Sequence, residues 1–243
     1  MIRLILPCYN EAENLPSVLA QITEALKETP YTIYAVEDGS TDATKSVLEN
    51  LSRQYPIRVL LHSLNRGVAA SFRTGFTAAV REAVDHEVIA LLEGDDTSTA
   101  IFLPEMIRRV QDGADMVIAS RYRPGGGYRR FPLRRLLLSR GANMVFRLFF
   151  PIPGVTDYTI FYRAYRVPPL RACMTDFGEH FIESTGFLAN AEILVKLRPY
   201  LRRVEEVPFL YDYGHKRGRS GMKIWKNLTS YLTFVARHAR RRI

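Results

Sequence analysis

The 243-residue chain is long enough to bury a sizeable core, and its 47% hydrophobic content excludes a disordered protein. Its net charge of +9 is unevenly distributed: residues 1–120 hold 10 Lys and Arg against 17 Asp and Glu, and residues 121–243 hold 24 against 8. The basic half indicates a polyanionic partner, either anionic lipid headgroups or nucleic acid, unless these charges simply form a solvated face.

The cysteines, the N-terminus and the apolar segments of the chain indicate its cellular location. Cys8 and Cys173 lie far apart without the spacing of a zinc site, which predicts a reduced, cytoplasmic protein without disulfides. The N-terminus runs directly into an apparent strand, so no signal peptide is expected. No window of eighteen uninterrupted apolar residues is present, so any membrane contact is expected to be peripheral.

The first half alternates short β-rich runs with helical patterns, which predicts an α/β fold with a mostly parallel sheet flanked by helices. The expected strands comprise residues 2–6, 32–36, 58–61, 88–92 and 116–119. The expected helices between them comprise residues 15–26, 42–54, 68–84 and 102–110.

The second half begins with a glycine-rich loop and continues as a basic amphipathic stretch, residues 133–150, in which arginines interleave with leucines and phenylalanines. This pattern is typical of a helix at a lipid headgroup interface. Further elements are expected as a strand at 160–165, a helix at 187–197, a strand at 201–210 and a helix within 223–243. The last of these is either a second interface helix or a core-packing helix with a solvated tail. One domain, 1–243, is the simpler interpretation.

Polar residues follow three of the predicted strands, at the sheet edge where doubly wound proteins bind ligands. They form the motifs Pro7-Cys8-Tyr9-Asn10-Glu11, Glu37-Asp38-Gly39-Ser40 and Glu93-Gly94-Asp95-Asp96. Neither GxGxxG nor GxxxxGK[ST] occurs, which excludes the common dinucleotide and P-loop sites. Carboxylates facing a nucleotide require Mg²⁺ or Mn²⁺ to offset repulsion, whereas an isolated acidic turn would only cap a helix.

These motifs make the chain resemble the GT-A-fold glycosyltransferases of family 2, and within them the dolichol-phosphate mannose synthases. The first motif, continued to Leu15, and the Asp38-Gly39-Ser40 turn are typical of the broad family. The lipid-phosphate branch is indicated by Ser120-Arg121-Tyr122, by Ser139-Arg140-Gly141-Ala142-Asn143 and by Glu206-Val207-Pro208. The resemblance covers nearly the whole chain, with residues 1–120 as the nucleotide-sugar-binding half and 121–243 as the acceptor and membrane-interface half.

The resemblance implies roles for individual residues. Glu93 and Asp95 would hold the metal, with Asp95 catalytic and Glu93 where the family usually has aspartate. The nucleotide would be bound by Pro7, Tyr9, Asn10, Glu11, Asp38, Gly39, Ser40, Gly67 and Gly94. The phosphate-gripping loop would use Arg217, Arg219, Ser220 and Lys223.

Three further residues are implied on the acceptor side. Arg121 and Arg135 would meet the pyrophosphate or the acceptor phosphate, the alternative being surface arginines. Glu192 would lie near the acceptor, the alternative being an exposed helix glutamate. The chain departs from its relatives at Thr159-Ile160, where they usually carry a small pair, so Ile160 is expected to reshape the sugar or acceptor pocket.

The implied activity is inverting transfer of a sugar, with GDP-mannose favoured as donor, to a polyprenyl or dolichyl phosphate at the cytoplasmic face of an anionic membrane. An acceptor phosphate is already anionic and needs no general base. The alternatives are UDP-glucose or UDP-N-acetylglucosamine as donor and an inactive accessory subunit. A membrane-anchoring partner protein is left open. The alternative of a nucleic-acid-binding protein leaves the carboxylate turns unexplained, and the chain lacks RNP, KH, zinc-finger and helix-turn-helix signatures.

Overall fold

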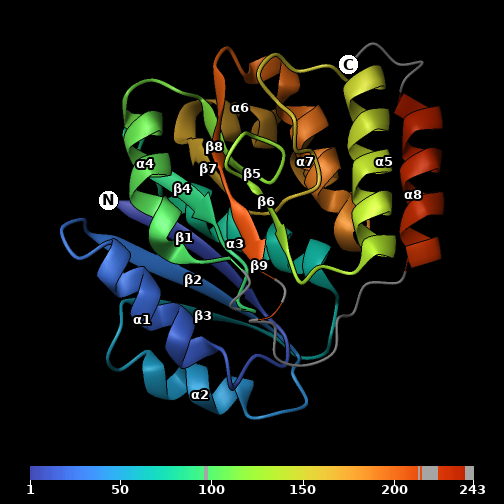
Figure 1. Ribbon diagram of the computed structural model, residues 1–243. Coiled ribbons are helices and arrows are strands. Elements are labelled where there is room, and N and C mark those ends of the chain that lie inside the picture. Colours follow the sequence, from blue (N-terminus) through green and yellow to red (C-terminus); the bar gives the residue numbers. More distant parts are fainter. Residues whose placement is uncertain (96–97, 213, 215–223, 239–243) are drawn as a thin grey trace.

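A seven-stranded sheet forms the centre of the computed structural model, which describes residues 1–95, 98–212, 214 and 224–238, without the side chains of 224–228 (Figure 1). In spatial order the strands are β3 (Ile57–His62), β2 (Tyr31–Asp38), β1 (Ile2–Cys8), β4 (Val88–Leu91), β7 (Arg163–Arg166), β5 (Met116–Ser120) and β8 (Val204–Pro208). All neighbours pair in parallel except β7, which is antiparallel to both β4 and β5. The predicted mostly parallel sheet is confirmed.

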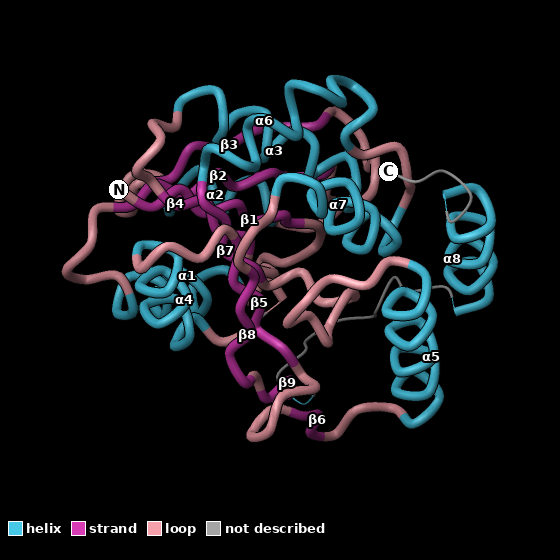
Figure 2. Tube along the Cα trace, turned by 90° about the horizontal axis from the view of Figure 1, so that it is seen from above, coloured by secondary structure: helices cyan, strands magenta, loops and turns pink. Residues whose placement is uncertain are grey.

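Helices cover both faces of the sheet, which explains why the central strands are apolar on both sides. Figure 2 shows α1 (Leu15–Ala25) and α4 (Leu103–Gln111) on one face, and α3 (Val68–Glu82) and α6 (Val167–Phe177) on the other. Two more helices are α2 (Thr44–Leu51), beside α1, and α7 (Ala189–Leu197), beside α6. The 3₁₀ turns are η1 (Ala100–Phe102), η2 (Gly178–Phe181), η3 (Gly186–Leu188) and η4 (Arg198–Tyr200).

Two helices lie side by side away from the sheet, α5 (Leu133–Phe149) and α8 (Ile224–His238) (Figures 1 and 2). Phe146 of α5 packs edge-on against Tyr231 of α8, with ring centroids 5.7 Å apart. The amphipathic stretch predicted at 133–150 is therefore a helix that has a neighbour on its apolar inner side. Among the described residues no helix is both long enough and apolar enough to cross a membrane.

Two sequence predictions of local structure were wrong, and one helix was not predicted. The strand expected at 201–210 is two strands, β8 and β9 (Leu210–Asp212), and β9 pairs with the unpredicted β6 (Gly127–Arg129). The strand expected at 160–165 begins only at Arg163, because the preceding residues turn toward Arg121. Helix α6 was not predicted; Pro168 and Pro169 lie in its first turn, where proline is tolerated.

Candidate functional site

A cavity of about 660 Å³ opens where β1, β2 and β4 end. Because parallel strands place their carboxyl ends at one edge, the three polar motifs converge there as expected. The predicted nucleotide and metal residues that line the cavity are Pro7, Tyr9, Asn10, Glu11, Asp38, Gly67, Glu93, Gly94 and Asp95.

Two predicted nucleotide residues instead contact neighbouring loops, Ser40 the loop after β1 and Gly39 the loop after β3. The Asn10 N–H donates to the Ser40 hydroxyl oxygen at 3.1 Å, and the Thr41 N–H donates to Asn10 Oδ1 at 2.9 Å. Gly39 has a φ of +64°, and a Cβ there would lie 2.3 Å from the carbonyl carbon of Leu64. Neither residue lines the described cavity, so both act by holding its rim together.

Asp38 is buried, and hydrogen-bond donors of the protein fix its carboxylate. Its carboxylate accepts the N–H groups of Arg66 at 3.0 Å and Gly67 at 2.8 Å. His62 Nδ1 lies 2.6 Å from Asp38 Oδ1 and must donate, because a carboxylate only accepts. The other His62 nitrogen, Nε2, lies 2.9 Å from the Thr74 hydroxyl. These bonds fix the orientation of Asp38 and leave Oδ2 able to accept one more, as from a ring N–H.

Glu93 and Asp95 follow β4 and line the cavity on either side of Gly94. A Cβ at Gly94 would lie 3.0 Å from the Pro7 carbonyl oxygen, so glycine lets this turn approach β1. The Ser98 hydroxyl donates to Glu93 at 3.2 Å. In the described part of the chain, no cluster of three or more His, Cys, Asp or Glu forms a complete metal site. A divalent cation bound by Glu93 and Asp95 would therefore need substrate phosphates and water as its other ligands.

Arg121, predicted to meet phosphate, forms a buried ion pair with Asp157. Its Nε and Nη2 each donate to one Asp157 oxygen at 2.7 Å, and Nη2 also donates to the Thr159 hydroxyl at 2.7 Å. Burial alone would raise the pKa of Asp157, but the charge and hydrogen bonds of Arg121 outweigh it and hold that pKa below its ordinary value. Nη1 of Arg121 makes no hydrogen bond to any described residue, and the guanidinium carbon lies 5.2 Å from the centroid of the Tyr128 ring.

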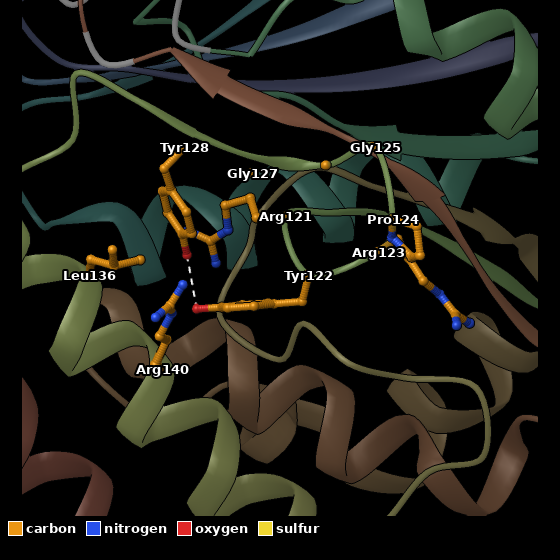
Figure 3. Close-up of a pocket in the computed structure, with 10 residues that line it drawn as sticks. Arg121, Tyr122, Arg123, Pro124, Gly125, Gly127, Tyr128, Leu136 and Arg140 are labelled. Carbon is orange, nitrogen blue, oxygen red and sulfur yellow. Dashed lines mark hydrogen bonds between the residues drawn. The ribbon is translucent and has the colours of Figure 1, made fainter.

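A second cavity of about 510 Å³ lies beside this pair, between the glycine-rich loop and α5 (Figure 3). The Tyr128 hydroxyl donates to that of Tyr122 at 2.9 Å, and both lie within 3.1 Å of the Ser139 hydroxyl. Arg140 extends from α5 toward these hydroxyls (Figure 3). Arg140 is exposed and forms no ion pair with a described residue. The cavity thus combines the buried Arg121 with a second, unpaired guanidinium.

The other predicted acceptor and phosphate residues lie elsewhere. Arg135 lines neither of these two cavities as described. Glu192 is buried, where it accepts the Ser184 N–H at 2.8 Å and the Lys196 ammonium at 2.6 Å. Glu192 also lines a third cavity of about 720 Å³ beside α8, so its predicted position near the acceptor stays a prediction. The loop residues Arg217, Arg219, Ser220 and Lys223 lie outside the described residues.

One segment connects the two cavities. Asp157 and Thr159 bind Arg121 of the second cavity, and Phe161, two residues farther along, lines the first. Arg163 supports the segment by donating to the Tyr158 carbonyl at 2.9 Å. Sequence reasoning missed Phe161 as a lining residue, although it follows the Thr159-Ile160 departure directly.

The sequence of this chain is similar to sequences of known proteins over most of its length. The sequence profile of glycosyl transferase family 2 matches residues 4–173. The chain is 36% identical over 210 residues to a polyprenol monophosphomannose synthase of Mycolicibacterium smegmatis, covering 86% of this chain and 76% of that protein. It is 31% identical over 237 residues to a dolichol-phosphate mannosyltransferase of Pyrococcus furiosus, covering 97% of this chain but only 63% of that protein.

The fold has a structural counterpart as well. A glucosyl-3-phosphoglycerate synthase from Mycobacterium tuberculosis, crystallised with Mn²⁺, UDP and glucosyl-3-phosphoglycerate, superimposes with a TM-score of 0.65 at 14% identity. The superposition covers 97% of this chain and 77% of that structure. At this identity the likeness shows the fold alone.

Proposed function

Because the chain belongs to glycosyl transferase family 2, we propose that it transfers a mannosyl residue from GDP-mannose to a polyprenyl phosphate. The mannosyltransferase names of its relatives from M. smegmatis and P. furiosus support the reaction. The observation that carries the proposal is the pairing of two cavities of opposite charge, one with carboxylates and one with guanidinium groups, through residues 157–161.

The carboxylate cavity suits the donor. Asp38, fixed by three protein donors, offers one acceptor position to a ring N–H of the base. Glu93 and Asp95 would hold Mg²⁺ or Mn²⁺, which neutralises charge on the departing diphosphate when bound. Because hydrogen bonds already fix Asp38, little reorganisation of the cavity is needed when the sugar nucleotide binds.

The guanidinium cavity suits the acceptor phosphate. Arg140 and Nη1 of Arg121 can hold phosphate oxygens, and the Tyr122 and Tyr128 hydroxyls lie beside them (Figure 3). A phosphate oxygen would form the new bond to the anomeric carbon, and the bond from that carbon to the diphosphate oxygen would break. Since the phosphate is already anionic, its orientation is the main task of the protein.

Peripheral contact with the cytoplasmic face of an anionic membrane would supply this lipid substrate. Leu133, Leu137, Met144 and Leu148 on α5 are 67%, 60%, 69% and 74% exposed. Their spacing of four, seven and four residues places them on one stripe of the helix. Arginines flank this stripe, so apolar side chains can enter the acyl region while guanidinium groups meet phosphate. A membrane-anchoring protein is also compatible with this exposed stripe.

A donor panel tests the proposal. Purified protein is incubated with a polyprenyl phosphate and GDP-mannose, UDP-glucose or UDP-N-acetylglucosamine, with and without Mn²⁺, and the glycolipid product is measured. We expect metal-dependent product from GDP-mannose. Product from a uridine donor alone would contradict the mannose assignment. No product from any donor, despite donor binding, would favour the accessory-subunit alternative.

A further inference from the structure

Ser71, in the first turn of α3, has a buried hydroxyl at the wall of the carboxylate cavity. The residue is 1% exposed, lines the carboxylate cavity, and its Oγ has no hydrogen-bond partner among the described residues. A serine inside a helix commonly bonds to the carbonyl four residues earlier, but Ser71 does not. A buried hydroxyl without a partner costs free energy, so its position at a ligand cavity points to a ligand that pairs with it.

An aromatic pair lines the same cavity. Phe161 and Phe187 are stacked, with ring centroids 5.5 Å apart and an interplanar angle of 24°. Phe72 of α3 supports Phe161 from the side, with centroids 4.8 Å apart and an angle of 73°. Phe161 is buried, whereas Phe187 of η3 is partly exposed. The pair is thus a packed apolar wall and not two mobile side chains.

The sheet register places this wall beside the metal carboxylates. Arg163 pairs with Leu91 in the antiparallel β7–β4 ladder, so the two chains leave the sheet next to each other. Two residues beyond the pair they bring Phe161 and Glu93 to the same cavity. A diphosphate bound at Glu93 and Asp95 would therefore carry its sugar toward Phe161, away from Asp38 at the far side of the strand order.

We propose that Ser71, Phe161 and Phe187 form the sugar subsite of the donor cavity and select the hexose that this chain transfers. The Ser71 hydroxyl pairs with a sugar hydroxyl, and the aromatic wall packs against the C–H face of the ring. The inference rests on the proposed function, which makes the donor a sugar nucleotide, and it adds the residues that select the sugar.

An isoprenoid chain is the other ligand that would pack against an aromatic wall. It has no polar group to pair with Ser71, whereas a hexose presents both hydroxyl groups and an apolar face. The combination of a partnerless hydroxyl with stacked rings therefore favours the sugar.

Binding measurements with Ser71→Ala test the hydroxyl. Titration calorimetry with Mn²⁺ present compares GDP with GDP-mannose, and UDP with UDP-glucose. We expect Ser71→Ala to weaken the sugar nucleotide that the wild type uses by about three- to tenfold and to leave its nucleoside diphosphate within about twofold. Thr77→Ala, an exposed position on the same helix, is the matched control and should change neither. Circular dichroism checks that each variant is folded.

Equal weakening of both ligands would assign Ser71 to the nucleotide and overturn the proposal, as would no change in either. Phe187→Leu tests the wall: we expect a higher KM for the donor and an unchanged KM for the polyprenyl phosphate. The reverse pattern would assign the aromatic pair to the isoprenoid chain. Since the Ser71 test compares each sugar nucleotide with its own diphosphate, it stays valid if mannose proves to be the wrong sugar.

Discussion

The two cavities hold their charged groups in opposite ways. In the carboxylate cavity Asp38 already accepts hydrogen bonds from three protein groups, so its position is fixed before any ligand arrives. In the guanidinium cavity Arg140 is exposed and has no ion-pair partner among the described residues. A site that must fix a neutral base gains from bound, oriented acceptors, whereas a site that captures a dianion gains from unpaired cations.

Arg121 stands between these two extremes. Its pairing with Asp157 neutralises most of its charge yet leaves Nη1 for a ligand. Because Asp157 and Phe161 belong to one segment, movement of the ion pair would also move the wall of the donor cavity. The contrast between the fixed carboxylate of Asp38 and the unpaired guanidinium of Arg140 thus predicts separable effects of substitutions at the two cavities and a shared effect at Asp157.

The largest effect on activity is expected from Asp95→Ala. Loss of one of the two carboxylates proposed to bind the metal removes part of its ligation, and we expect transfer to fall by about a thousandfold. Product lipid is measured at saturating Mn²⁺, with Asp85→Ala, an exposed carboxylate whose side chain is 73% accessible, as the control. A folded Asp95→Ala variant with wild-type activity would show that the metal assignment is wrong.

Asp157→Asn is expected to destabilise the fold by about 3–5 kcal/mol, because Arg121 would remain buried without its counter-charge. Urea unfolding at neutral pH measures this loss. Asp112→Asn, which breaks an exposed pair with Arg108, is the control and should be nearly neutral. A stability change at Asp157 no larger than that at Asp112 would contradict the assigned role of the buried pair.

The same pair predicts how stability depends on pH. The pKa of Asp157 is lower in the folded protein than in the unfolded chain. Its contribution is therefore complete above the ordinary carboxyl pKa of about 4 and is lost as pH falls through the lower folded value. Wild-type stability should decline below about pH 4 more steeply than that of Asp157→Asn. Parallel pH profiles of the two proteins would contradict this interpretation.

Arg140→Ala tests the free cation and should act on one substrate only. We expect the KM for polyprenyl phosphate to rise by about tenfold and the donor KM to stay unchanged, because a charge-assisted hydrogen bond is lost only at the acceptor. Arg134→Ala, on the same helix but outside the cavity, is the control. Steady-state kinetics with each substrate varied separately provide the measurement. A rise in both KM values would contradict the separate roles assigned to the two cavities.

The contrast also explains what could be predicted from sequence. The donor residues follow strands within contiguous motifs such as Pro7-Cys8-Tyr9-Asn10-Glu11, so sequence order alone indicated the convergence that the sheet produces. Gly39 and Ser40 belonged to the same motifs, yet they contact neighbouring loops. Only coordinates could separate lining residues from those that support them.

The acceptor side was harder because its pieces meet through tertiary packing. Arg140 rather than Arg135 lines the phosphate cavity, a choice that depends on the rotation of α5 about its axis. Arg121 was predicted as a phosphate ligand, but its partner Asp157 lies 36 residues away. Neither this pairing nor the Lys196 contact that occupies Glu192 follows from composition or spacing.

The smallest effect is expected at the exposed stripe of α5. Leu148→Ser removes one apolar side chain from the membrane contact, and we expect binding to anionic liposomes to fall by about threefold in sedimentation assays. Leu64→Ser, which alters a 63% exposed leucine between β3 and α3, is the control and should bind as the wild type does. Salt should weaken wild-type binding, because the arginines beside the stripe act through screened charge. Equal losses of binding at positions 64 and 148, or equal binding to neutral and anionic liposomes at low salt, would contradict the proposed contact between the basic half of the chain and an anionic membrane. Arg140 would then bind a phosphate that membrane contact does not supply.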